Sequence, residues 1–150
     1  GSRRARLPAA ERLARVAEQV LRWEGARTTR VEVTLLGALA MRRMNRRVTG
    51  RRGLTDVLAF GLPHPDGRVL GDVYICRAAA VRYVAAHRHA DPQGRGRGTI
   101  DEELVRLAVH GTLHVLGYDH PEGAGRMRSA MWRRQERYVD RLRGRGVRAR

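Results

Sequence analysis

The stretch "TIDEELVRLAVHGTLHVLGYDH", residues 99–120, predicts one long buried helix followed by a sharp reversal of the chain. Its T-x-x-E start, Thr99 and Glu102, has the pattern of a capping box at a helix N-terminus. Beyond this start, apolar residues occupy nearly every face, which indicates a helix buried on all sides. Gly117 permits a left-handed turn that ends the helix. We therefore expect a central helix over 100–116.

Three histidines, His110, His114 and His120, interrupt this apolar stretch. The first two are four residues apart, so they share one helix face with Cβ atoms about 5–6 Å apart. The third follows the glycine turn, which can swing it back toward the same point. Three neutral imidazoles with an open position for water are the pattern of a catalytic zinc site. The spacing therefore predicts one zinc ion per chain, held by these three residues.

The spacing H-x3-H-x2-G-x2-H resembles the zinc motif of metzincin proteases, H-E-x-x-H-x-x-G-x-x-H. One position differs, because the glutamate that serves those proteases as general base is here Gly111. Peptide hydrolysis by a zinc-activated water needs such a base. We expect a zincin-like metal helix, and a zincin-type metallopeptidase stays open as an alternative function.

The rest of the sequence predicts a single α+β domain over 1–150, with a small mixed β-sheet covered by helices. Helices are expected over 8–24, 38–47, 78–90, 100–116 and 123–143, and strands over 31–36, 55–60 and 69–76. Pro and Asp-Gly turn signals between the last two strands indicate a hairpin. A basic loop is expected at 91–98 and a basic tail from about 144.

The composition predicts a strongly basic surface, since 31 basic residues, all arginine, face 15 acidic ones for a net charge of +16. Such a surface attracts polyanions, and nucleic acid is the first candidate. The sequence contains no run of about 18 apolar residues, so no membrane-spanning segment is expected. The first four residues contain no apolar signal region. One cysteine, Cys76, forms no internal disulfide, so we expect a cytoplasmic location.

Six of the arginines lie between residues 42 and 52, a segment without a single acid. A guanidinium group matches phosphate oxygens with two parallel hydrogen bonds. We therefore expect contacts with an RNA backbone from Arg46, Arg47, Arg51 and Arg52. A solvated helix face is the alternative.

The motifs "LTDVLAF" at 54–60, "LGDVYI" at 70–75 and "HGTLHVLGYDH" at 110–120 occur in this order in the chain. They resemble P-T-D-V-L-S-F, G-D-I-x-I and H-G-x-L-H-L-x-G-Y-D-H of the YbeY endoribonuclease family. The pair "MN" at 44–45 stands where that family has Leu-Asn. The resemblance runs from about residue 31 to 140.

This resemblance implies an endonuclease that cuts single-stranded RNA. It implies a role in maturation of ribosomal RNA, including the 3′ end of the small-subunit RNA, and in ribosome quality control. Single-stranded RNA, ribosomal RNA and the ribosome are then the expected partners, and no dinucleotide cofactor is expected. The resemblance also implies zinc bound by the three histidines, with His114 a catalytic residue. A non-catalytic ribosome-binding module with a structural metal stays open as a further alternative.

Two positions near the expected site need separate interpretation. The arginine that the family has after Leu-Asn falls on Thr49 here, so Arg51 and Arg52 are the candidates for its catalytic role. Asp119 precedes a ligand, and we expect its carboxylate to orient an imidazole or to cap the turn.

Overall fold

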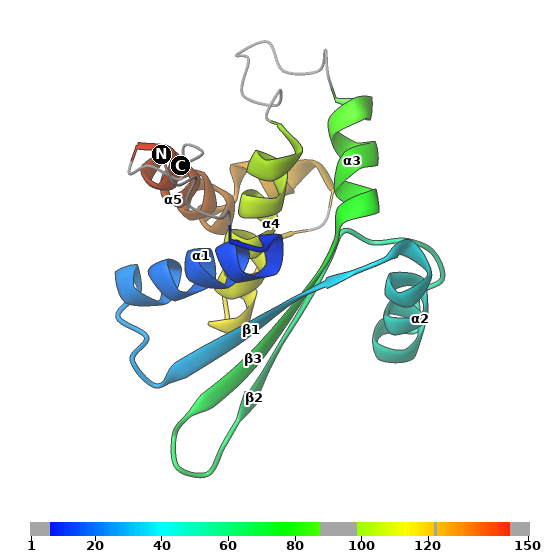
Figure 1. The fold of residues 1–150 in the computed structure, drawn as a ribbon. Coiled ribbons are helices and arrows are strands. Elements are labelled where there is room, and N and C mark those ends of the chain that lie inside the picture. Colours follow the sequence, from blue (N-terminus) through cyan, green and yellow to red (C-terminus); the bar gives the residue numbers. More distant parts are fainter. Residues whose placement is uncertain (1–6, 88–98, 122, 145–150) are drawn as a thin grey trace, which may run out of the picture.

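A computed structural model gives the fold and describes residues 7–87, 99–121 and 123–144. The elements follow one another as α1 (Ala9–Trp23), β1 (Thr29–Leu36), α2 (Ala38–Thr49), β2 (Val57–Pro63), β3 (Val69–Cys76), α3 (Arg77–Ala86), α4 (Ile100–Val115), the 3-10 helix η1 (Gly123–Arg128) and α5 (Ala130–Gly144) (Figure 1). The expected loop at 91–98 and the tail after 144 lie outside the described residues. No helix in the described part is long and apolar enough to cross a membrane.

The sheet has three strands in the order β1-β3-β2. Strands β2 and β3 pair antiparallel across a short connection, as the turn signals predicted. Strands β1 and β3 pair in parallel, because α2 and β2 lie between them in the chain and carry it back to the same end of the sheet. The predicted α+β class with a small mixed sheet is confirmed.

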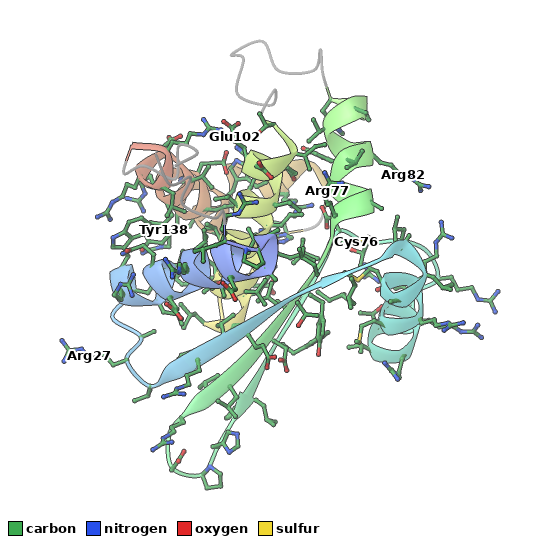
Figure 2. The ribbon with its side chains drawn as sticks, in the orientation of Figure 1. Arg27, Cys76, Arg77, Arg82, Glu102 and Tyr138 are labelled. Carbon is green, nitrogen blue, oxygen red and sulfur yellow. The ribbon has the colours of Figure 1, made fainter. Side chains whose placement is uncertain are left out.

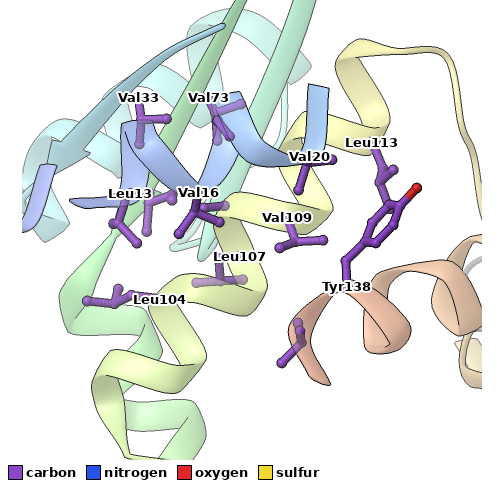
Figure 3. Packing of buried hydrophobic residues seen from close by; sticks show 14 of the residues in the cluster. Leu13, Val16, Val20, Val33, Val73, Leu104, Leu107, Val109, Leu113 and Tyr138 are labelled. Carbon is purple, nitrogen blue, oxygen red and sulfur yellow. The ribbon is translucent and has the colours of Figure 1, made fainter. Parts of the chain in front are cut away.

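One face of the sheet forms the main core with α1 and α4. Alternate strand residues such as Val33 and Val73 point toward these helices, where Val16, Val20 and Val109 meet them (Figure 3). Helix α1 buries the stripe that its periodicity predicted, Leu13, Val16, Ala17, Val20 and Leu21. Tyr138 of α5 closes the far side of α4. Helix α4 is therefore packed on several sides, in keeping with its apolar sequence.

The opposite face of the sheet is covered at one end by α2. There Met41 of α2 packs with Leu58 and Cys76, which alternate with the residues of the main core. Figure 1 shows α2 and α4 on either side of the sheet. The arginine-rich helix and the histidine helix thus belong to different layers.

Helix α4 lies very close to the sheet, and Gly111 allows this. A Cβ atom at Gly111 would lie 2.6 Å from a methyl carbon of Val73, closer than real Cβ contacts come. At the end of the helix, the Val115 side chain occupies the space above Gly71 in the same way. Small residues at these contacts let the helix bring its histidines close to the strands.

Several expected boundaries were wrong by a few residues. Strand β2 begins at Val57 rather than 55 and continues to Pro63, helix α2 continues to Thr49, and helix α3 ends at Ala86. The larger difference is the helix expected over 123–143, which is two elements. Glycines at 123 and 125 are poor helix formers, and the first has a φ of 80°. The α-helix starts only after Ser129, whose Oγ accepts a hydrogen bond from the Trp132 amide.

Candidate metal centre

The end of α4 sets the position of the three histidines. The helix starts as predicted, with Thr99 Oγ1 accepting a hydrogen bond from the Glu102 amide at 3.2 Å. At its other end Gly117 takes a φ of 97°, a conformation that favours glycine. The Tyr118 amide then donates to the Leu113 carbonyl at 3.1 Å, which turns the chain back along the helix.

This turn brings His120 beside His110 and His114. Each residue offers one ring nitrogen, and the three nitrogens lie within 4.8 Å of one another. The Nε2 atoms of His110 and His114 are 3.0 Å apart, and the ring centre of His120 lies 5.0 Å from those of the other two. His110 is buried, while the other two are partly exposed. The structure therefore brings together the three ligands that the spacing predicted.

Oxygen acceptors hold the other nitrogen of each ring. His110 Nδ1 lies 2.6 Å from Gln135 Oε1, and His114 Nδ1 lies 2.9 Å from the Tyr118 carbonyl. His120 Nδ1 lies 3.1 Å from the Pro121 carbonyl. Because these oxygens only accept hydrogen bonds, each Nδ1 carries the ring proton. The three Nε2 atoms are left with free lone pairs.

Free lone pairs on nitrogens 3.0 Å apart repel each other unless a proton or a cation lies between them. Tetrahedral zinc with Zn–N bonds of about 2.0–2.1 Å separates two ligand nitrogens by about 3.3 Å. The spacing of His110 and His114 is close to that value, and neutral imidazole is a favoured ligand of zinc. The three residues therefore fit a metal ion with three nitrogen ligands.

Burial keeps the ligand rings neutral. It lowers the pKa of His110 to about 4, against the opposing effect of the hydrogen bond to Gln135. Burial likewise lowers the pKa of His114, and the hydrogen bond to the Tyr118 carbonyl opposes this. Both rings are thus unprotonated at neutral pH, which is the form that binds metal.

Gln135 is a site residue that the sequence analysis did not identify. It is fully buried on α5, and its Nε2 donates to Glu136 Oε2 at 3.1 Å. That bond fixes the amide so that Oε1 faces His110. Glu136 is itself held by Arg106 at 3.0 Å. The available signal was a glutamine within the apolar stripe of α5, among Met131, Tyr138, Val139 and Leu142.

The four arginines expected to contact RNA take no part in the hydrogen-bond network that links Arg106, Glu136, Gln135 and His110. Arg46 and Arg47 are exposed on the last turn of α2, and Arg51 and Arg52 are exposed in the loop that follows. Because α2 packs on the face of the sheet opposite α4, the first two belong to another layer than the histidines. A role of the four in RNA contact or catalysis stays a prediction.

The loop after α2 is held by residues at its base. Thr49 hydrogen-bonds through Oγ1 to the Asn45 carbonyl at 2.6 Å and to Asn45 Oδ1 at 2.8 Å. It also accepts a hydrogen bond from the Arg51 amide, while Asn45 Nδ2 donates to the Gly53 carbonyl. Thr49 therefore shapes the backbone that carries the loop arginines.

Asp119 and Gly111 also have defined surroundings. The Asp119 carboxylate accepts a hydrogen bond from the His120 amide at 2.8 Å, so it caps the turn beside a ligand. The ring nitrogens of the ligands have other partners, and an orienting role of Asp119 on an imidazole stays a prediction. Gly111 faces Val73 and Val57 of the sheet. A glutamate at this position would collide with the sheet, which disfavours the peptidase alternative.

A cavity of about 420 Å³ lies elsewhere on the molecule, lined by Arg27, Thr28, Arg30, Arg68 and Leu70. Arg30 and Leu70 are paired across β1 and β3, and they alternate with the core residues Val31 and Val69. The cavity therefore opens on the face of the sheet opposite α4. Arg27 projects from the body of the molecule in Figure 2. These arginines belong to the basic surface and not to the histidine site.

Comparisons with known proteins agree with the histidine motif. The family model described as Endoribonuclease YbeY matches residues 3–143. A protein named Endoribonuclease YbeY from Anaeromyxobacter sp. (strain Fw109-5) is 36% identical over 124 residues, which cover 81% of this chain and 60% of that protein. A protein of the same name from Chlorobium phaeovibrioides is 34% identical over 144 residues. The aligned residues cover 94% of this chain and 86% of that protein.

A solved structure is also similar. The solution structure of TM1509 from Thermotoga maritima superposes with a TM-score of 0.60 at 26% sequence identity. The superposition covers 91% of this chain and 82% of that one.

Proposed function

Since this chain belongs to the YbeY endoribonuclease family, we propose that it is a zinc-dependent hydrolase that cuts single-stranded RNA internally. One observation carries the proposal. One ring nitrogen from each histidine lies within 4.8 Å of the other two, while each Nδ1 has an oxygen acceptor beside it. Such an arrangement of rings serves a metal with an open position better than a structural site, which four protein ligands usually close.

His110, His114 and His120 would hold the zinc ion. When bound, zinc supplies a Lewis acid that polarises a phosphoryl oxygen and lowers the pKa of water. Gln135 fixes the plane of the His110 ring and keeps its proton on Nδ1. The lowered pKa values of His110 and His114 keep both rings available as ligands at neutral pH.

The arginines would hold the RNA backbone. Arg46 and Arg47 on α2, with Arg51 and Arg52 in the next loop, form an exposed basic segment without acidic neighbours in the sequence. The net charge of +16 supports a polyanionic substrate. Arg51 and Arg52 are also the candidates in this segment for a direct catalytic role at the phosphate.

The physiological substrate would be ribosomal RNA, processed at the 3′ end of the small-subunit RNA and during ribosome quality control. Family membership and the basic surface support this part of the proposal. It is tested by incubating the purified protein with precursor small-subunit RNA, free or in ribosomal particles, and mapping the new 3′ ends. Cleavage confined to single-stranded sites near the mature 3′ end is expected.

The catalytic part is tested with a labelled RNA oligonucleotide, single-stranded or annealed to its complement. The zinc-loaded protein should cut the single strand internally and leave the duplex intact, and a chelator should stop the reaction. RNA binding without any cleavage would favour the non-catalytic ribosome-binding module. Casein serves as a control for the peptidase alternative, and no hydrolysis is expected because position 111 carries no general base.

A further inference from the structure

The pocket of about 420 Å³ lies where strands β1 and β3 begin, apart from the histidine site. Its lining consists of three arginines, a threonine and a leucine, namely Arg27, Thr28, Arg30, Arg68 and Leu70. Figure 1 shows that this end of the sheet points away from α2 and α3. Ligand sites in proteins have volumes of about 300–1,000 Å³. The pocket is therefore large enough for a small ligand or for one unit of a polymer.

Backbone pairing holds the lining residues side by side. The Val69 amide donates to the Thr28 carbonyl at 3.0 Å, which joins the segment before β1 to the start of β3. One residue farther along, Arg30 and Leu70 are partners in the parallel ladder. Their side chains share the face opposite α4, because their neighbours Val31 and Val69 pack against the main core. The pocket is therefore part of the sheet itself.

The arginines of the pocket carry charge that the described part of the protein does not neutralise. Arg27 and Arg30 form no ion pair with a described carboxylate, whereas Arg68 Nε lies 3.4 Å from Asp66 Oδ2. All three arginines are exposed, and Arg27 projects into solvent in Figure 2. A guanidinium group offers two parallel hydrogen bonds to the oxygens of a phosphate group. The pocket is therefore suited to a phosphate ligand.

Two carboxylates limit where this phosphate can lie. Glu32 and Asp72 form a ladder pair two residues beyond Arg30 and Leu70, on the same face of the sheet. Both are exposed, and neither forms an ion pair with a described arginine. Because like charges repel, these carboxylates keep an anion away from the middle of the sheet. The phosphate is thus confined to the end of the sheet that holds the arginines.

An apolar surface adjoins the arginines. Leu70 is 44% exposed, and Leu62, its partner in the antiparallel pair, is 63% exposed. Directly opposed residues of a strand pair point to the same face, so the two side chains form one apolar patch beside Arg30. A nucleotide combines a phosphate with a base whose flat faces are apolar. Arginines beside leucines therefore suit a nucleotide better than an inorganic anion.

We propose that this pocket binds one nucleotide of a single-stranded RNA, with its phosphate at Arg27 and Arg30 and its base against Leu70 and Leu62. The proposal adds a binding site on the face of the sheet opposite the histidine helix, and it includes no chemical step. It rests on the proposed function for the choice of RNA as the polyanion. The net charge of +16 favours the same class of ligand.

An NMR experiment locates the ligand through the methyl signals of leucine and the Nε–H signals of arginine. Adenosine 5′-monophosphate, inorganic phosphate and adenosine are titrated separately into the purified protein. We expect adenosine monophosphate to shift the signals of Leu62, Leu70 and Arg30 in a saturable way. Phosphate alone should shift the arginine signal, and adenosine should bind more weakly than its monophosphate.

A competition experiment distinguishes a strand from a free nucleotide. A single-stranded DNA oligonucleotide is added to the complex with adenosine monophosphate. DNA serves as the probe because a phosphate site reads no 2′-hydroxyl group and a ribonuclease leaves DNA uncut. We expect the oligonucleotide to displace the nucleotide from Leu62 and Leu70.

An affinity experiment uses the same DNA with a fluorescent label and measures its anisotropy. Arg27→Gln combined with Arg30→Gln should weaken binding about tenfold, because charge-assisted hydrogen bonds to phosphate are lost. The slope of log K against log salt should become shallower by about 0.7, the value for one phosphate. The control, Arg15→Gln with Arg82→Gln, removes the same charge from exposed positions on α1 and α3. It should bind within about twofold of the parent protein, since distant charges are screened by salt.

The melting temperature of each variant is measured, so that a folding defect is recognised. The inference is overturned if the pocket variant and the control bind DNA alike, or if adenosine monophosphate leaves the leucine signals unchanged. Adenosine monophosphate that stays bound at saturating oligonucleotide would assign the pocket to a free nucleotide and contradict the proposal. A polyglutamate peptide that binds there as tightly as the oligonucleotide would contradict it too. All readouts record binding, so they decide the inference even if the protein cuts no RNA, a result that would refute the proposed function alone.

Discussion

The histidine end of α4 and the arginine-rich end of α2 differ in how far folding fixes their functional side chains. At the first, each histidine ring contacts a defined acceptor, and His110 is 4% exposed. At the second, the arginines from 46 to 52 are exposed on a helix end and a loop. Folding itself fixes the metal ligands against protein acceptors, whereas the arginine side chains are exposed to solvent. The two regions should therefore respond differently to substitution.

The largest difference is expected in metal binding. We expect His114→Ala to reduce zinc from about one ion per chain to nearly none, because two imidazoles hold zinc poorly. Elemental analysis after gel filtration measures this. The control is His87→Ala. This histidine lies outside the motif, and its ring contacts the Tyr83 carbonyl. Full zinc retention by His114→Ala would show that the triad is not the site.

The pH dependence of stability should come next. Below pH 6.5 the unfolded chain binds a proton at His110, while the folded ring stays neutral until about pH 4. The contribution of the neutral His110 ring to the unfolding free energy is therefore complete above about pH 6.5 and is lost as the pH falls toward 4. We expect the metal-free protein to lose about 3 kcal/mol of unfolding free energy over this interval, measured by urea unfolding.

His110→Leu provides the comparison, because it removes the titrating ring and keeps an apolar side chain. Its unfolding free energy should fall less steeply over the same pH interval. Equal slopes in the two proteins would mean that His110 is not held neutral by burial.

Gln135 offers a smaller and more specific test. Gln135→Leu removes the acceptor for His110 Nδ1, so the ring loses its fixed tautomer. We expect zinc affinity to fall about 10–100-fold, measured by competition with a chromogenic chelator. Gln135→Glu keeps an acceptor and should retain most of the affinity. If both variants bind zinc like the parent protein, the network from Arg106 to His110 plays no part in metal binding.

The smallest effects should come from the exposed arginines. Arg51→Ala combined with Arg52→Ala should raise KM a few-fold and leave kcat unchanged at saturating RNA. The slope of log K against log salt should become shallower by about 0.7 for each phosphate that the variant no longer neutralises. The double variant Arg46→Ala and Arg47→Ala should show the same changes in KM and in the salt dependence. A fall of kcat at saturation would instead place these arginines at the reacting phosphate.

The same contrast explains what the sequence could reveal. The helix over 100–116 and its ligands follow from local rules: a capping box, an apolar pattern, and histidines four residues apart before a glycine. The mixed sheet followed from strand patterns and one hairpin turn. Each of these signals lies within a short segment, so single-sequence analysis reached them.

The remaining features depend on contacts between distant segments. Gln135 meets His110 across 25 residues, and nothing near either residue indicates the pairing. The segment over 123–143 was expected to be one helix, whereas the structure separates η1 from α5 at Ser129. The sequence showed that Gly111 replaces the general base of the metzincin motif. Its close packing against Val73 could be seen only in the structure.

Zinc titration of RNA cleavage tests the central claim most directly. The protein is stripped with a chelator, zinc is added back in steps, and cleavage of a single-stranded RNA is measured together with bound zinc. We predict that activity returns in proportion to bound zinc and reaches its plateau at one ion per chain. Cleavage that persists in the stripped protein, or zinc that binds fully without restoring cleavage, would contradict a metal-dependent site at His110, His114 and His120.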